Sequence, residues 1–320
     1  MAEAPIGLTM GDPAGVGPEI TVLALSGGGI DFPVRVIGDR GRLEEARDLL
    51  ARSGRIGPFD LSVVDLVDLA NVEPSLPWGE LSPAAGRACF EYVAAAAAMA
   101  LDGDVSAICT APINKEAWRA AGIAHPGHTE ALASLTGSPR FAMMLINGSL
   151  RVLHLSTHSS LIEAVGLATT ERCIACIELA SEFLRDQAGI RRPRVAVAGI
   201  NPHAGENGLL GEEDRERLAP AVAAARASGI DASGPWSPDT VFARGAAGEF
   251  DCVIAAYHDQ GHIPIKMLGL DTGVNVTVGL PIIRTSVDHG TAFDIAGRAL
   301  ARSENLVTAL GLARGLAESR

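Results

Sequence analysis

The chain has 320 residues, more than one compact hydrophobic core usually contains, so its length predicts two domains or one large α/β unit with two lobes. Hydrophobic residues make up 48% of the chain and aromatic residues only 4%, a balance that favours parallel strands under alanine-rich helices over a β-sandwich. The net charge of -12 argues against nucleic acid and anionic membranes as partners, because both attract clustered Lys and Arg.

The sequence also predicts a cytoplasmic location. Its longest apolar run, Tyr92 to Leu101, is far shorter than the roughly 20 residues that cross a bilayer, and the N-terminus lacks the charged-then-apolar order of a signal peptide. Five cysteines, an odd number, indicate reduced thiols. Cys173 and Cys176 have a spacing known from zinc sites, but no second Cys or His pair lies near them, so we predict buried structural thiols.

From the N-terminus onward, an apolar strand, a turn and a helix follow one another repeatedly, which is the rhythm of βαβ units. We expect strands at 5–10, 33–38, 105–111, 141–147, 150–157, 194–200, 251–257 and 273–281. We expect helices at 18–26, 41–51, 113–122, 170–187 and 212–227, and two more after Asp288 and Ser303. Because no linker rich in Gly and Ser separates them, we expect two interleaved α/β lobes with a ligand cleft between them, residues 1–130 with 275–320 and residues 131–274.

The segment GDPAGVGPEI at 11–20 connects the first predicted strand to the first predicted helix. Its glycines Gly11, Gly15 and Gly17 miss the G-x-G-x-x-G spacing, and no Walker A sequence occurs, so a Rossmann or P-loop cofactor site is unsupported. The segment is therefore either a tight turn or a ligand-facing loop.

Two loops that lead into helices carry candidate anion-binding residues. Lys115 in TAPINKEA and the run HPGHTEAL each lie where a helix N-terminus offers backbone N–H groups and the positive end of its dipole. Thr129 either caps its helix or binds a phosphate oxygen, with His128 beside it. Later in the chain, the candidates for binding a carboxylate or phosphate are Lys266, Asn275 and Arg284. The alternative for each cation is a solvated surface position.

Three histidines follow predicted strands at equivalent places: His158, His203 and His258. Because the carboxyl ends of parallel strands face the ligand crevice of an open sheet, we expect the three imidazoles to converge, within one subunit or across two. Three neutral imidazoles with open positions are typical of a catalytic zinc site, and Mg2+, Mn2+ or Co2+ remain alternatives. For each histidine alone, a hydrogen-bonded loop residue is the better explanation, but the strand-end context that the three share favours a metal. His154 lies inside a predicted strand, so we expect it in the core.

The chain resembles the 4-hydroxythreonine-4-phosphate dehydrogenase family, including its D-threonate and D-erythronate 4-phosphate dehydrogenase branch, over essentially its full length. The resemblance lies in GDPAGVGPEI, TAPINKEA, GHTE, the TH of LSTHSSL, INPHAGENG, GPWSPDT, YHDQGHIPIK and GVNVTVGLPIIRTSVDHGTAFDIAG. It implies a homodimer whose subunits have an isocitrate and isopropylmalate dehydrogenase-like two-lobed fold, not a Rossmann fold. The active site then lies in the cleft and is completed by the second subunit, with dimer contacts in the second lobe.

The resemblance also implies roles for individual residues. It supports one divalent metal per active site, Zn2+, Mg2+ or Co2+, with the ligands His158, His203 and His258. It makes substrate contacts of His128, Thr129, Lys266, Asn275 and Arg284. The stretch DHGTAFDIAG resembles the adenosine-side loop of the β-decarboxylating dehydrogenases, which implies binding of NAD or NADP by His289, Gly290, Thr291, Ala292 and Asp294.

The implied reaction is oxidation of the C3 hydroxyl of 4-phosphohydroxy-L-threonine by NAD or NADP, followed by loss of CO2 to give 3-amino-2-oxopropyl phosphate, in pyridoxal phosphate biosynthesis. We expect the metal to act as a Lewis acid, and Lys266, or Asp259 or Asp239 through water, to accept the hydroxyl proton. The first alternative is a D-threonate or D-erythronate 4-phosphate dehydrogenase, which forms dihydroxyacetone phosphate and CO2. A cis-dihydrodiol carboxylate dehydrogenase, a zinc hydrolase and a non-catalytic ligand sensor are further alternatives.

Overall fold

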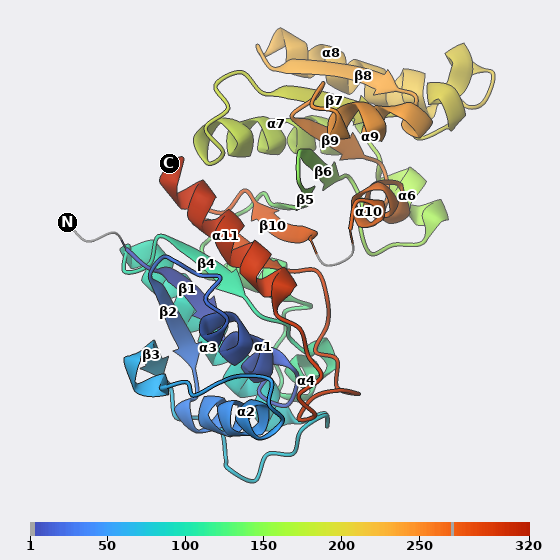
Figure 1. Cartoon of the computed structure of the whole chain (residues 1–320). Helices are drawn as coiled ribbons and strands as arrows, with labels where there is room; N and C mark the ends of the chain where they lie inside the picture. The colour runs from blue at the N-terminus through green and yellow to red at the C-terminus, as the bar shows by residue number, and fades with distance from the viewer. Residues whose placement is uncertain (1–3, 270–271) are drawn as a thin grey trace. The chain divides into compact units, whose positions relative to one another are not determined.

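The computed structural model describes residues 4–269 and 272–320. They form two compact units, each a β-sheet with helices packed on it, so the α/β class expected from composition is confirmed (Figure 1). The first unit comprises Met1–Pro139 and Leu280–Glu318, and the second comprises Arg140–Gly279 with Ser319–Arg320. The first crossing between the units thus follows Pro139 instead of residue 130, and the second follows Gly279 instead of residue 274.

The sheet of the first unit is parallel, with the strand order β3-β2-β1-β4-β11. Its strands are β1 (Ile6–Thr9), β2 (Val34–Gly38), β3 (Asp65–Asp68), β4 (Ala107–Thr110) and β11 (Arg284–Val287). Every residue of β1, β4 and β11 is buried, which is typical of parallel strands that are covered on both faces.

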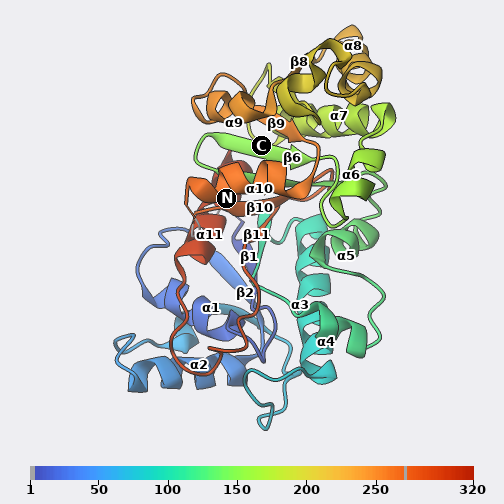
Figure 2. The same ribbon diagram turned by 90° about the vertical axis from the view of Figure 1, so that its right-hand side faces the viewer.

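Helices cover both faces of this sheet (Figure 2). They are α1 (Gly17–Ser26), α2 (Arg40–Arg52), α3 (Pro83–Asp102), α4 (Lys115–Ala120), α5 (His128–Leu135) and α11 (Glu304–Glu318). Helix α3 packs against β1, β2 and β4, and α11 packs against β1, β4 and β11. By length and composition α3 passes as a membrane span, but 44% of its apolar window is buried inside the molecule, and a core helix passes the same test.

The sheet of the second unit has the strand order β10-β5-β6-β9-β7-β8. The strands are β5 (Ala142–Asn147), β6 (Leu150–His154), β7 (Arg194–Ala198), β8 (Asp231–Trp236), β9 (Cys252–Ala255) and β10 (Val274–Val278). The pairs β10–β5 and β5–β6 are antiparallel, whereas β6, β9, β7 and β8 run parallel. The carboxyl ends of β6, β9 and β7 therefore lie at one edge of the sheet.

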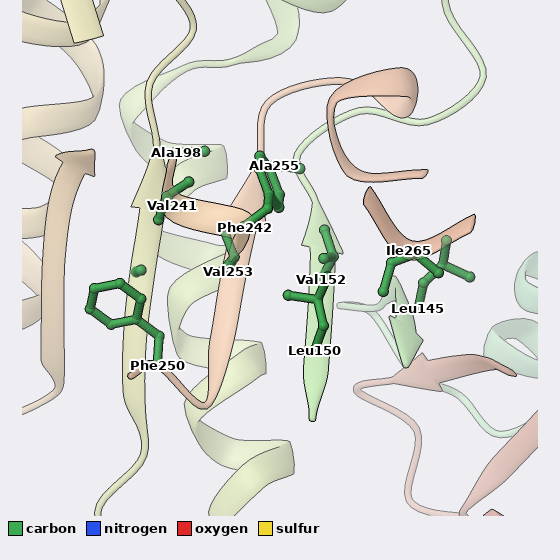
Figure 3. Close-up of a cluster of buried hydrophobic side chains, with 11 residues drawn as sticks. Leu145, Leu150, Val152, Ala198, Val241, Phe242, Phe250, Val253, Ala255 and Ile265 are labelled. Carbon is green, nitrogen blue, oxygen red and sulfur yellow. The ribbon is translucent and has the colours of Figure 1, made fainter. Parts of the chain in front are cut away.

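The helices of the second unit are α6 (Leu161–Leu167), α7 (Thr170–Asp186), α8 (Ala219–Ala227), α9 (Pro238–Ala246) and α10 (His258–Met267). A π-helical turn, Asp214–Leu218, runs directly into α8. Strand and helix side chains meet in a buried cluster formed by Leu145, Leu150, Val152, Ala196, Ala198, Val241, Phe242, Phe250, Val253, Ala255 and Ile265 (Figure 3). Burial of each large aliphatic or aromatic member contributes about 1.5–3 kcal/mol, which anchors α9 and α10 on this sheet.

All five cysteines are buried and form no disulfide, which confirms the prediction of reduced thiols. Cys173 and Cys176 both face the core from α7, so their spacing is that of neighbouring buried positions on one helix.

The prediction of a helix directly after Asp288 is wrong. Between β11 and α11 the chain forms turns, and the next helix begins only at Glu304. Ala292 and Ala299 have φ angles of 44° and 55°, which a right-handed helix does not allow. The N–H groups of Gly297 and Ala299 donate to the side chain of Glu19 instead of to carbonyls one turn earlier. A distant carboxylate therefore overrides the local helical tendency.

Candidate functional site

The sheet of the second unit delivers the three predicted metal-binding histidines to the same edge. His158 follows β6, His258 is the first residue of α10 after β9, and His203 follows β7 in the short 3-10 segment Pro202–Gly208. Because β6, β9 and β7 are parallel neighbours, their carboxyl ends bring these three loops together. The strand-end pattern in the sequence thus corresponds to real adjacency of the strands.

A pocket of about 410 Å³ opens beside two of these histidines. Its lining consists of Thr157, His158, Ser159, Ser160, Leu161, Glu163, Tyr257, His258 and Asp259. The ring centroids of His158 and His258 are 6.2 Å apart. Two imidazoles that bind one zinc ion through bonds of about 2 Å have centroids roughly 5 Å apart. A small side-chain adjustment therefore suffices for both rings to bind one ion.

Carboxylates set the orientation of two imidazoles. Nδ1 of His258 lies 2.7 Å from Oδ1 of Asp259, and Nδ1 of His203 lies 2.6 Å from Oε1 of Glu206. A carboxylate accepts hydrogen bonds, so Nδ1 carries the hydrogen and Nε2 keeps the lone pair that a metal needs. The hydrogen bond that His203 donates to Glu206 also raises the pKa of His203 above its ordinary value. The donor chemistry of these residues fits a divalent metal.

His262 packs against His258 inside the second unit. The two rings stack with centroids 3.6 Å apart, and Nδ1 of His262 donates to the carbonyl of His258 at 3.0 Å. His154 lies next in the row, 4.7 Å from His262, and is buried as expected. Burial, followed by the charges of His262 and His258, lowers the pKa of His154 to about 3, so it is neutral.

The three predicted metal ligands do not form one cluster within the described part of the chain. Among the described residues, no group of three His, Cys, Asp or Glu side chains is placed to hold a metal ion. His158 and His258 share the pocket, whereas His203 is absent from its lining. The convergence of all three histidines therefore stays a prediction for the assembled protein.

The three candidate bases all belong to the second unit. Asp259 accepts the hydrogen bond from Nδ1 of His258. Asp239, at the start of α9, accepts a hydrogen bond from Ser237 Oγ at 2.5 Å, which lowers its pKa. Lys266 is exposed in the last turn of α10. Asn275 of β10 is different, because its Oδ1 is buried and has no hydrogen-bond partner in the described part of the chain.

The first unit gathers cations around the start of α5. Arg284 of β11 is almost fully buried, and its guanidinium donates to Thr110 Oγ1 at 2.8 and 3.2 Å. Burial lowers the pKa of Arg284 to about 10, so it remains charged at neutral pH. Burial, then the charges of Arg284 and Lys115, lowers the pKa of His128 well below its ordinary value.

His128 occupies the first position of α5, where backbone N–H groups and the helix dipole favour an anion. Its Nε2 is buried and has no partner among the described residues. Thr129 follows in the same first turn. The buried cation Arg284, the exposed cation Lys115 and a helix N-terminus are together a suitable binding site for a phosphate group.

The five predicted cofactor residues occupy one turn-rich segment of the first unit, directly after β11. His289, Gly290 and Asp294 are exposed, and Thr291 and Ala292 are half-buried. A Cβ atom added at Gly290 would meet nothing within 4 Å, so the turn faces open space. The turn is therefore accessible to solvent at Gly290.

The chain is similar in sequence and structure to proteins of one known family. Residues 32–313 match the family described as Pyridoxal phosphate biosynthetic protein PdxA. The chain is 48% identical to D-threonate 4-phosphate dehydrogenase from Cupriavidus necator, over 98% of both chains. It is 45% identical to 4-hydroxythreonine-4-phosphate dehydrogenase from Desulfosudis oleivorans, over 96% of this chain and 94% of the other. The crystal structure of 4-hydroxythreonine-4-phosphate dehydrogenase from Klebsiella pneumoniae superposes with a TM-score of 0.90 at 46% identity, covering 98% of this chain and 100% of that one.

Proposed function

The chain belongs to the PdxA family of pyridoxal phosphate biosynthetic proteins, and on this basis we propose that it is a metal-dependent NAD(P) dehydrogenase of a small phosphorylated 3-hydroxy acid. The observation that carries the proposal is the pair His158 and His258 in one pocket, with Asp259 holding Nδ1 of His258. Such a pair suits catalysis at a metal better than a purely structural role, because the pocket leaves room for substrate.

The metal ligands in this proposal are His158, His203 and His258. A bound divalent metal supplies Lewis acidity at the hydroxyl that is oxidised. Since the described residues of one chain bring only two of the three ligands into the pocket, we propose that a second copy completes the site in a homodimer. Ile162 of α6 and Met267 of α10 expose 89% and 81% of their surface in the single chain, which supports dimer contacts in the second unit.

The phosphate of the substrate binds at the start of α5, held by Arg284 and Lys115 with His128 and Thr129. Asn275 offers its buried oxygen to a hydroxyl or amino group of the substrate. The turn from His289 to Asp294 would hold the adenosine side of NAD(P), and the bound cofactor would supply the hydride acceptor for oxidation at C3.

The hydroxyl proton passes to Lys266, or through water to Asp239 or Asp259. The resulting β-keto acid then loses CO2, because the adjacent ketone delocalises the electrons of the broken bond. The whole reaction is an oxidative decarboxylation in the cytoplasm.

Two substrates fit this reaction. The name of the relative at 48% identity favours D-threonate 4-phosphate, and that of the relative at 45% identity favours 4-phosphohydroxy-L-threonine. The test follows absorbance of the reduced nicotinamide with purified protein, a divalent metal, NAD or NADP, and each compound in turn, with D-erythronate 4-phosphate as a third. Turnover of the amino compound assigns the protein to pyridoxal phosphate synthesis, and turnover of only the sugar-acid phosphates assigns it to carbon catabolism. The absence of turnover with all three contradicts the proposal and leaves the dihydrodiol, hydrolase and sensor alternatives.

A further inference from the structure

The GDPAGVGPEI segment packs against the turn that carries the candidate cofactor residues. The N–H of Val16 donates to the carbonyl of Thr291 at 2.9 Å. A Cβ atom at Gly15 would lie 2.8 Å from Cβ of Thr291, so the glycine permits a close approach of the two backbones. The sequence left open whether GDPAGVGPEI is a tight turn or a ligand-facing loop. The structure supports a tight turn, and this turn packs against the 289–299 segment.

Glu19 makes the strongest link between the two segments. It lies in the first turn of α1 and is completely buried. Its Oε2 accepts from the N–H of Gly297 at 2.9 Å, and its Oε1 accepts from the N–H of Ala299 at 2.8 Å. Burial raises the pKa of Glu19, while these two backbone hydrogen bonds lower it. A buried carboxylate with both oxygens bonded to one distant segment fixes that segment firmly.

The 289–299 segment needs such support because its backbone is strained. Ala292 and Ala299 adopt left-handed φ angles, which residues with a Cβ atom rarely do and which persist only where the surroundings determine them. Arg55 adds a second restraint by donating to the carbonyls of Ala299 and Ala301 at 2.6 and 2.8 Å. Glu19 and Arg55 therefore hold the N–H and the C=O of the same strained alanine.

We propose that Glu19 is a positioning residue for NAD(P), which acts by holding the 289–299 segment in the shape that the cofactor requires. The inference rests on the proposed function, because it takes His289–Asp294 as the cofactor-binding turn. The proposal predicts that replacement of Glu19 weakens the affinity for the cofactor and leaves the affinity for the phosphorylated substrate nearly unchanged. The hydrogen bonds of Glu19 run to Gly297 and Ala299, which belong neither to the phosphate site at α5 nor to the histidine loops of the second unit.

The test compares Glu19→Gln with the wild-type protein. Glutamine keeps the shape but turns an NH2 group toward one of the two backbone N–H groups, so one hydrogen bond is lost. We expect the Kd for NAD or NADP, measured by tryptophan fluorescence titration without substrate, to rise about tenfold. The KM for NAD(P) rises in parallel, whereas the KM for the phosphorylated substrate changes less than about twofold.

Gly15→Ala provides a second variant that does not depend on a buried charge, because its methyl group pushes against Thr291 directly. Gly311→Ala is the matched control, since that exposed helical glycine has nothing within 4 Å of its added Cβ. Weaker cofactor binding by Glu19→Gln, with Gly311→Ala unchanged, supports the proposal, and weaker binding by Gly15→Ala shows in addition that the cofactor depends on the shape of the 289–299 segment. Folded Glu19→Gln and Gly15→Ala proteins with wild-type affinity overturn it while leaving the dehydrogenase function standing. A wild-type protein that binds neither nucleotide overturns the proposed function and this inference together.

Discussion

Asp259 holds Nδ1 of His258 at 2.7 Å, and this contact leaves Nε2 as the nitrogen that can bind a metal. We therefore expect Asp259→Asn to weaken metal binding about tenfold, because the asparagine amide supports the opposite tautomer as readily. Calorimetric titration of metal-free protein with Zn2+ or Co2+ measures the change. Asp186→Asn, on the exposed end of α7, serves as the control. An unchanged metal affinity together with a large loss of turnover would show that Asp259 acts as a base instead.

Replacement of His203 by Ala removes the predicted ligand that one chain does not bring into the pocket. We expect metal content and turnover to fall together, turnover by at least about a hundredfold. Metal content is measured by elemental analysis after dialysis and turnover by nicotinamide absorbance. His125→Gln is the control histidine, as it stacks on Phe90 in the first unit. Full activity of the metal-free variant would rule out the metal mechanism.

Arg284 combines burial with a charge-assisted contact to Thr110, so Arg284→Lys keeps the charge and loses the planar fork. We expect the KM for the phosphorylated substrate to rise about tenfold or more, with little change in the KM for NAD(P). Steady-state kinetics with both substrates varied separates the two effects. The exposed Arg140→Lys is the control. Equal changes in both KM values would indicate general damage to the fold rather than loss of a phosphate contact.

Asp12 introduces a pH dependence into the stability of the first unit. Burial raises the pKa of Asp12 from 3.8 to about 6, although the Ala14 N–H donates to its Oδ1 at 2.8 Å. Because the folded-state pKa lies above the unfolded one, folding favours the protonated form. This contribution to stability is complete below pH 3.8 and is lost as the pH rises through about 6.

Asp12→Asn removes the titration and keeps the acceptor for Ala14. Relative to the wild-type protein, the variant should gain stability between pH 3.8 and pH 7, by about 3 kcal/mol at most. Urea unfolding at several pH values measures the difference, and the exposed Asp31→Asn is the control. Parallel pH profiles of Asp12→Asn and wild type would show that folding leaves the pKa of Asp12 unshifted.

The sequence predicted those parts of the fold and site that depend on local pattern. The apolar runs and the position of each histidine after a strand were sufficient to place His158, His203 and His258 at the ends of β6, β7 and β9. Their adjacency followed from the parallel pairing of these strands, a rule of α/β sheets.

What the sequence did not predict depends on contacts between distant segments. Glu19 bonds to Gly297 and Ala299, and no pattern within either segment indicates this, so the region after Asp288 was expected to be helical. The partner of His203 carried a weak local signal, because Glu206 follows three residues later in INPHAGENG. The left-handed backbone of that segment, with a φ of 53° at His203, is what brings the two side chains together.

The first unit is assembled from both ends of the chain, and this has a consequence for its synthesis. The second unit, apart from its last two residues, is a continuous stretch from Arg140 to Gly279, so all its strands have been translated before β11 is made. Strand β4 gains its neighbour β11, and β1 and β4 gain the cover of α11, only when the C-terminal residues leave the ribosome. During most of translation the sheet of the first unit therefore lacks β11 and the cover of α11. Premature termination before Leu280 leaves the edge of this sheet exposed, which favours aggregation.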